Sequence, residues 1–365
     1  PQEGNFQWHL IDHWVQAEAL QAGKRAAFAI TTYHGRIEGG IATPAWVYTP
    51  AHGGDAHAVV NCGGVLIPRY WDAHYLAKYN AFVQALGARY NNDPRLTWVQ
   101  IGTGLYGETQ PADDQDNQCL KNALAADVGV ADTLLLSSHW VTTVNTITDY
   151  YVSAFPSATL FLQYVPTFLD ACERKHTTDY AAARGVGLFE AGLTADFNNA
   201  IFPPSTGYAG CGAYEPLMTW RGQAPLAWES IRYMLPTATH VYWGVLNALD
   251  KHADYINFEH HFWQDAAGNP ISENFPHFAL ANRFLGRTIA DTPSVWVALR
   301  DHRQETAGNP YWPQWGNYSF WLYQDDSVPG GRTVTETNDA SVYLPTYNPN
   351  LPAGKEGWVT RRTDQ

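Results

Sequence analysis

The sequence predicts an α/β fold: a (β/α)8 barrel followed by a small β-rich segment at the C-terminal end. Short apolar runs of strand length alternate with helix-length amphipathic stretches over most of the chain. No glycine-rich phosphate-binding turn is present, which favours a barrel over an open nucleotide-binding sheet. After about residue 290 the helical patterns give way to alternating strands. We therefore expect a catalytic barrel over residues 1–290 and a β-rich segment over 291–365.

The first part of the chain begins with apolar residues at helical spacing between Trp8 and Ala19. A buried strand is expected at 25–32 and a long Gly- and Pro-rich loop at 35–61. An amphipathic helix follows from Tyr75 to Tyr90 and ends before Pro94. The first six residues are typical of the middle of a structured domain, so we expect the chain to lack its true N-terminus.

The rest of the barrel repeats the same alternation. Further strands are expected at 96–101, 159–165, 186–190, 225–229 and 240–246. Helices are expected at 126–155, at 169–184 and from residue 230 onward. In the C-terminal segment, the runs 294–300 and 318–323 alternate like strands and are separated by turn residues. Strands separated by helices pair in parallel through right-handed crossovers.

Composition and charge narrow the class of partner. Aromatic residues make up 14% of the chain, with 15 Trp and 21 Tyr, and aromatic faces stack well on sugar rings. The formal charge of −13 argues against nucleic acid and against strongly anionic polysaccharides. No apolar stretch reaches the roughly 18–20 residues of a membrane span. We expect a neutral carbohydrate as the partner; the sequence does not determine the oligomeric state.

The four cysteines, Cys62, Cys119, Cys172 and Cys211, lack the close spacing of a zinc site. Either they form one or two disulfide bonds in a secreted or extracytoplasmic protein, or they are four separate thiols. Cys172 and Cys211 follow neighbouring expected strands, so we predict a disulfide bond between them.

Candidate functional residues lie where the barrel strands end, because catalytic groups gather on that face of a barrel. Two carboxylates are distinctive. A strand that opens into glycines at 102–107 leads to Glu108, and the run 224–229 places Glu229 beside Trp228. We expect the glycines to leave room for a sugar. The residues expected to bind substrate are Tyr33, Tyr106, His139, Gln163, Tyr164, Glu190, Trp228, Trp243 and Asn247.

Two carboxyl groups on opposite sides of a scissile bond are what glycoside hydrolysis requires. Glu108 and Glu229 are therefore the predicted catalytic pair, with Glu190 as the reserve carboxylate. The spacing of His9 and His13 resembles a metal-binding pattern, but a third ligand is missing. No metal and no cofactor are expected.

Three segments resemble a known family. The opening pattern Pro-x-Glu-Gly-x-Phe-x-Trp-x-x-x-Asp of residues 1–12 is similar to the start of helix one in the large clan of retaining β/α-barrel glycoside hydrolases, which includes the bacterial β-galactosidases. Residues 68–108 resemble the third helix and fourth strand of related barrels, and 224–229 is similar to the strand that holds the clan's nucleophile. The resemblance covers roughly residues 1–249. It implies that Glu108 is the acid/base, that Glu229 is the nucleophile, and that the first strand is absent.

One departure affects the expected mechanism. Much of the clan has Asn before the acid/base, whereas this chain has Gly107. A Gly-Glu pair after a glycine-rich strand also resembles the acid segment of the β-amylases, which invert configuration. A retaining double displacement on a neutral oligo- or polysaccharide is the expectation. The alternatives are an inverting glycosidase or lyase on the same barrel, and a non-catalytic sugar-binding barrel.

Overall fold

The computed structural model forms two compact units, Pro1–Phe189 and Glu190–Gln365, which are described separately. It describes residues 3–13, 15, 19–36, 39–164, 166–194, 208, 210–250 and 253–286. Within these ranges the side chains of 218, 239, 243, 246, 247, 250, 283 and 284 are excepted. Farther along, the backbone of 294–301, 318–322, 335–337 and 359–362 is also described.

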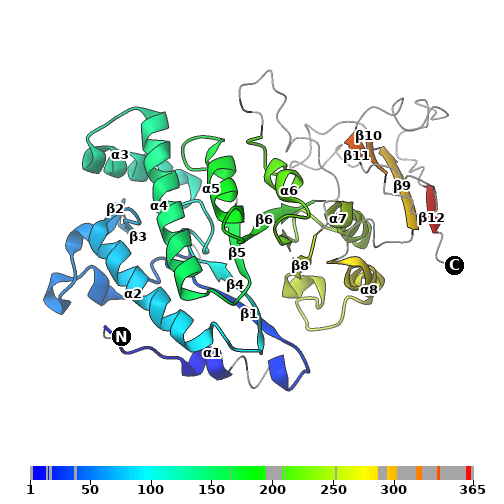
Figure 1. Cartoon of the computed structure of the whole chain (residues 1–365), viewed down its shortest axis with the longest axis horizontal. Coiled ribbons are helices and arrows are strands. Elements are labelled where there is room, and N and C mark those ends of the chain that lie inside the picture. Colours follow the sequence, from blue (N-terminus) through cyan, green and yellow to red (C-terminus); the bar gives the residue numbers. More distant parts are fainter. Residues whose placement is uncertain are drawn as a thin grey trace. The chain divides into compact units, whose positions relative to one another are not determined.

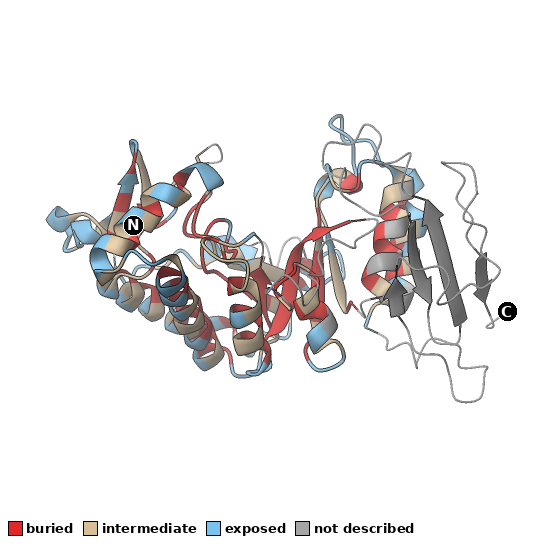
Figure 2. Ribbon diagram, turned by 90° about the horizontal axis from the view of Figure 1, so that it is seen from above, coloured by how far each residue is buried: buried red, intermediate tan, exposed pale blue. Residues whose placement is uncertain are grey.

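The first unit is built on three parallel strands. Strand β4 (Leu96–Ile101) pairs with β1 (Ala26–Ala29) on one side and with β5 (Leu160–Tyr164) on the other. All five residues of β5 are buried, as expected for a strand covered on both faces. Figure 2 colours buried residues red: the strands of the parallel sheet are largely red, whereas the helices are mixed red, tan and pale blue. The strands predicted at 25–32, 96–101 and 159–165 are confirmed.

Helices of the first unit connect and cover these strands (Figure 1). They are α1 (His9–His13), α2 (Ala73–Tyr90), α3 (Asn117–Val128), α4 (Thr133–Ala154) and α5 (Glu173–Ala182). Helices α2 and α4 begin at aspartate caps, Asp72 and Asp132, whose carboxylates accept backbone N–H groups of the first turn. The two helices pack against each other, and the hydroxyl of Tyr79 reaches both the Tyr151 hydroxyl at 2.9 Å and the Gly102 carbonyl at 2.7 Å. This contact ties both helices to the end of β4.

The segment 35–61, expected to be an irregular loop, is more ordered than predicted. It contains three short 3-10 turns, Ala45–Val47, Pro50–His52 and Ala56–Ala58, and the strand β2 (Val59–Cys62). An antiparallel hairpin joins β2 to β3 (Val65–Pro68). Its two central residues, Gly63 and Gly64, have φ of 63° and 93°, a conformation that favours glycine in tight hairpin turns. A Gly-Gly pair between two apolar runs was the local signal for this hairpin.

A disulfide bond joins Cys62, at the end of β2, to Cys119 in α3, with a Cα–Cα distance of 5.9 Å. Cys172 and Cys211 are disulfide-bonded as well, so none of the four cysteines is a free thiol. The expectation of disulfide bonds is confirmed. The specific pairing of Cys172 with Cys211 stays a prediction.

The parallel sheet has the strand order β1-β4-β5-β6-β7-β8. The two units divide within β6 (Gly187–Leu193). In the second unit, β7 (Leu226–Ser230) and β8 (Tyr255–Phe258) pair in parallel. The helices of this unit are α6 (Glu215–Trp220), α7 (Ala238–Asp250) and α8 (Phe275–Phe284). The strand predicted at 225–229 is confirmed, shifted by one residue.

The strand predicted at 240–246 is wrong, because these residues lie inside the helix α7. The buried residues Val241, Val245 and Ala248 are four and three positions apart, which is the spacing of a helical face. A short apolar run does not distinguish a buried strand from a buried helix. The strand that pairs with β7 is instead Tyr255–Phe258.

Near the C-terminal end, four strands form an antiparallel sheet in the order β11-β10-β9-β12. They are β9 (Ser294–Asp301), β10 (Tyr318–Leu322), β11 (Thr335–Thr337) and β12 (Val359–Arg362). The described residues thus carry a mixed α/β fold whose six-stranded parallel sheet agrees with part of a β/α barrel. A complete (β/α)8 barrel, a separate C-terminal appendage and the domain limits 1–290 and 291–365 stay predictions. No helix in the described part is both long and apolar enough to cross a membrane.

Candidate active site

Glu108 follows a loop that leaves the end of β4 and folds back on itself. The backbone N–H of Glu108 donates to the Leu105 carbonyl at 2.8 Å, and the Thr103 hydroxyl donates to the Glu108 carbonyl at 2.5 Å. Farther out, the N–H of Tyr106 donates to the carbonyl of Tyr33 at 2.9 Å, which joins the loop to the segment after β1. The loop that carries Glu108 is therefore held by hydrogen bonds within itself and by one to the distant Tyr33.

The glycines of this loop have a different role from the one expected. A Cβ atom on Gly104 would lie 2.0 Å from the Gln110 carbonyl oxygen, and one on Gly107 would lie 3.0 Å from the Ile30 carbonyl oxygen. Gly107 also has a φ of 88°, which glycine adopts without strain. The space left by the absent side chains is filled by the protein's own backbone. The expectation that these glycines make room for a sugar is wrong at both positions.

Amide side chains orient the carboxyl group of Glu108. The residue as a whole is only 8% exposed. Gln163 donates through Nε2 to Oε1 at 3.3 Å, and Gln110 donates through Nε2 to Oε2 at 3.2 Å. Gln163 is positioned in turn by Gln100, whose Nε2 donates to its Oε1 at 2.5 Å. A buried carboxylate needs such donors, because an unpaired buried charge is costly. The structure thus brings the predicted site residues Glu108 and Gln163 together. It also shows two residues of this cluster that were not predicted from the sequence, Gln100 and Gln110.

Tyr106, two residues before Glu108, has an unusual backbone conformation. Its φ of 54° is left-handed, which is strained for an aromatic residue, and 37% of its surface is exposed. Its hydroxyl lies beside Gly35, where an added Cβ would be 3.0 Å away. Strained residues persist where the surroundings hold them, and they cluster at functional sites.

Tyr33 and Tyr164 are fully buried, so their rings pack inside the first unit rather than on an open surface. Burial raises the pKa of Tyr33 to about 12, and the charges of Asp113 and Asp116 add to this effect. The Tyr33 hydroxyl therefore stays protonated at neutral pH. Direct contact of these two residues with a substrate stays a prediction.

His139 lies on the exposed face of α4 rather than at a strand end. Its buried neighbour Trp140 has the closer link to the site, because its indole Nε1 donates to the Thr109 carbonyl at 3.0 Å. Trp140 continues the helical face of Leu136 and Val144, and that periodicity was a signal for its burial. Gln100 could have been recognised from the sequence too, because it is the single glutamine in the largely apolar run 96–101.

In the second unit, Glu229 is the penultimate residue of β7 and is half-buried, in register with Asn257 of β8. Because side chains alternate along a strand, Glu229 and its neighbour Trp228 point to opposite faces of the sheet. Ser230 ends the strand, and its hydroxyl donates to the Asn257 carbonyl at 2.7 Å. The chain thus holds Glu229 at the carboxyl end of a parallel strand pair, as predicted from the sequence.

Trp228 is fully buried, and Tyr214 packs edge-on against it with ring centroids 4.4 Å apart. The Tyr214 hydroxyl donates to the Gly192 carbonyl at 2.9 Å, so it links β6 to β7. Sequence reasoning missed Tyr214, because nothing in its local pattern indicates these partners. The indole N–H of Trp228 has no hydrogen-bond acceptor among the described residues, although most buried donors have one.

Glu190 was expected at the end of its strand, but β6 continues to Leu193. Its residue is 6% exposed, and its Oε2 accepts the N–H of Gly192 at 2.6 Å. The side chains of Trp243 and Asn247 lie outside the described residues, and their backbone belongs to α7 rather than to a strand end. Within the described residues, no three His, Cys, Asp or Glu side chains are grouped as metal ligands.

Comparisons with known proteins give only distant structural likeness. No protein-family model and no curated protein matches the chain. A β-galactosidase from the psychrophilic Marinomonas ef1 is 12% identical, with a TM-score of 0.48 over 77% of this chain and 52% of that one. The cold-adapted β-galactosidase from Rahnella sp. R3 is 12% identical, with a TM-score of 0.45 over 78% and 49%.

A third solved structure, of an exo-β-agarase, is 9% identical to this chain, with a TM-score of 0.42 over 78% of this chain and 49% of that one. The chain therefore spans about half the length of the solved structures that it matches. Because all three TM-scores lie below 0.5, the likeness carries no weight for function, which has to be argued from the residues themselves.

Proposed function

We propose that the chain is a glycoside hydrolase that acts on a neutral oligo- or polysaccharide, with Glu108 and Glu229 as its catalytic carboxylates. The observation that carries the proposal is the setting of Glu108. Its carboxyl group is almost fully buried, is held by the amides of Gln110 and Gln163, and follows a loop with the strained Tyr106. A carboxyl group oriented in this way after a parallel strand suits proton transfer to a bound substrate.

Glu229 is the proposed nucleophile. In the first step its carboxylate forms a bond to the anomeric carbon, while Glu108 gives its proton to the departing glycosidic oxygen. In the second step Glu108 takes a proton from water, the water oxygen bonds to the anomeric carbon, and the bond to Glu229 breaks. The configuration is retained because the anomeric carbon is inverted twice. No cofactor takes part.

Aromatic and polar side chains of both units supply the proposed substrate contacts. Tyr106 offers a partly exposed ring for stacking. Trp228 is fully buried, so contact of its indole with substrate requires the ring to become exposed on binding. The other proposed binding residues are Tyr33, His139, Gln163, Tyr164, Glu190, Trp243 and Asn247. The disulfide bonds support a secreted or extracytoplasmic location, where such bonds persist.

Kinetics of carboxylate variants test the proposal. The substrate is first found by screening aryl glycosides and plant or algal polysaccharides. Glu229→Gln should then abolish turnover. Glu108→Ala should be slow on natural substrate but nearly normal in its first step on activated aryl glycosides, which need no proton. Asp114→Asn, which removes an exposed carboxylate, is the matched control and should keep full activity.

Azide and product stereochemistry separate the mechanisms. Azide needs no general base, so it should restore the second step of Glu108→Ala and give a glycosyl azide of retained configuration. A crystal structure should place the two carboxyl groups about 5–5.5 Å apart, whereas roughly 6.5–9.5 Å would indicate inversion. Full activity of Glu108→Ala on natural substrate would refute its role, and Glu190 would be tested next. Sugar binding without any turnover would indicate a non-catalytic barrel.

A further inference from the structure

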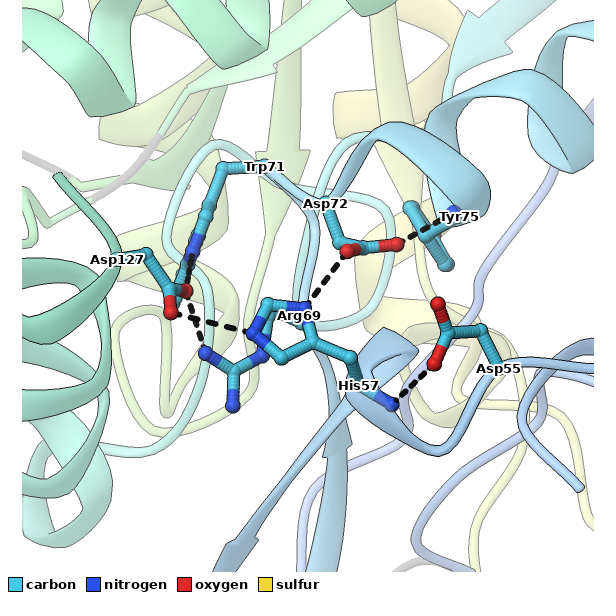
Figure 3. Close-up of polar contacts among 7 residues, drawn as sticks. All are labelled: Asp55, His57, Arg69, Trp71, Asp72, Tyr75 and Asp127. Carbon is cyan, nitrogen blue, oxygen red and sulfur yellow. Dashed lines mark hydrogen bonds and ion pairs between the residues drawn. The ribbon is translucent and has the colours of Figure 1, made fainter.

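His57 contacts a carboxylate with each of its two ring nitrogens (Figure 3). Its Nδ1 lies 2.8 Å from Oδ2 of Asp72, and its Nε2 lies 3.3 Å from Oδ1 of Asp127. The His57 side chain is 52% exposed, so solvent protons reach it freely. All three residues belong to the first unit and lie outside the candidate active site.

Protonation decides whether both contacts are favourable. A neutral imidazole carries one N–H and one lone pair, so it can donate to only one of the two aspartates. Its other nitrogen would then direct a lone pair at a carboxylate oxygen. An imidazolium donates through both nitrogens and also carries the positive charge that two carboxylates attract. The observed geometry therefore matches the protonated ring.

The two aspartates are themselves held by other groups. Asp72 caps α2, where its Oδ1 accepts the N–H of Tyr75 at 2.9 Å, leaving Oδ2 for His57. Asp127, in the last turn of α3, forms an ion pair with Arg69 and accepts the indole N–H of Trp71 at 2.7 Å. Both aspartates would stay in place without His57, because each keeps these partners.

His57 itself lies in the short turn Ala56–Ala58, which begins where Asp55 accepts the His57 backbone N–H at 2.9 Å. Its ring is the side-chain link between this turn, the start of α2 and the end of α3. The charged groups that face it are Asp72, Asp127 and Arg69. The hydrogen bond to Asp72 raises the pKa of His57 above its ordinary value, with the charges of Asp127 and Asp72 acting in the same direction and with burial and Arg69 opposing them.

We propose that His57 is a proton-dependent clasp, which holds the Ala56–Ala58 turn against α2 and α3 when protonated and releases the turn when deprotonated. Linkage gives the direction. A histidine with a raised folded-state pKa stabilises the closed form fully below about pH 6.5, and this contribution is lost as the pH rises through the folded-state pKa. The release is local, because Asp127 keeps Arg69 and Trp71 and the Cys62–Cys119 bond still joins α3 to the hairpin.

Two measurements on the full chain test the clasp without any substrate. The first is the NMR titration of the His57 ring, which should give a pKa above about 6.5. The Asp127→Asn variant keeps the shape but loses one charge, so its His57 pKa should fall toward that value. The second is hydrogen exchange of residues 55–58, corrected for the intrinsic rate at each pH. Opening should increase as the pH rises from about 6 to about 8.5.

The two results are linked quantitatively. Each unit by which the His57 pKa exceeds that of the opened form should correspond to a tenfold increase in opening across the titration. The turn in His57→Gln should open to the same extent at all these pH values. His176→Gln, a change at an exposed histidine on α5, should behave as the unaltered chain. A His57 pKa at or below about 6.5 would overturn the proposal, as would opening of 55–58 that is pH-dependent to the same degree in His57→Gln.

Discussion

Gln163 should contribute measurably to the stability of the Glu108 site, and Gln163→Leu tests this. The change removes the amide that donates to Glu108 at 3.3 Å, and it removes the acceptor of the Gln100 amide at 2.5 Å. Leucine has a similar volume, so the main loss is hydrogen bonding rather than packing. Because Glu108 and Gln163 are both buried, solvent does not readily replace either bond.

The expected magnitude follows from these two contacts. A hydrogen bond contributes about 0.5–1.5 kcal/mol between neutral groups and about 1.5–3 kcal/mol to a charged group, and 3.3 Å is a long distance for either. We therefore expect a coupling of about 1–2 kcal/mol between Gln163 and Glu108. The unpaired amide of Gln100 adds about 1–3 kcal/mol. Gln163→Leu should therefore lower the free energy of unfolding by about 2–5 kcal/mol.

The assay is a double-mutant cycle measured by urea unfolding at neutral pH. It compares the unaltered chain with Gln163→Leu, with Glu108→Leu and with the double variant. Gln84→Leu, at an exposed position on α2, replaces Gln163→Leu in a control cycle and should show no coupling to Glu108. A coupling between Gln163 and Glu108 below about 0.5 kcal/mol, the range found for independent sites, would refute the reasoning.

Three further predictions concern stability. Replacing Cys62 and Cys119 by Ser should cost about 4 kcal/mol in urea unfolding, because their bond closes a separation of 57 residues; an unchanged midpoint would contradict this. Tyr106→Val should be less stable than Tyr106→Asn by about 1–2 kcal/mol, because Asn tolerates the left-handed φ of 54° and a β-branched residue does not; equal stabilities would show that the loop relaxes. Burial raises the pKa of Glu173 from 4.5 to about 7, so its stabilising contribution is present below about pH 4.5 and is lost as the pH rises through about 7. Between these pH values the free energy of unfolding of the unaltered chain should fall by up to about 3 kcal/mol, and that of Glu173→Gln should not show this fall. Parallel curves of stability against pH for the two proteins would contradict the prediction.

Local pattern was enough to predict much of the parallel sheet. The strands predicted at 96–101, 159–165 and 225–229 were recognisable because a short apolar run bounded by turn residues carries its signal within a few positions. Helix α2 was recognisable from residues three and four apart between Tyr75 and Tyr90. The same reasoning placed Glu108 just after one strand and Glu229 near the end of another, because strand ends follow directly from strand positions.

Other features required the tertiary structure, because they depend on residues far apart in the chain. The run 238–250 is apolar enough for a strand or a helix, and its packing decided for the helix. Gln163 and Gln100, 63 residues apart, meet only because β4 and β5 are neighbours, and no local pattern records that pairing. The contacts of His57 with Asp72 and Asp127 span 15 and 70 residues. The sequence alone determined most of the parallel strands and placed Glu108 and Glu229 near strand ends, because these signals are local. Only the folded chain decided that 238–250 is a helix, which amides hold Glu108 and which charges surround His57, because these depend on residues far apart in the chain.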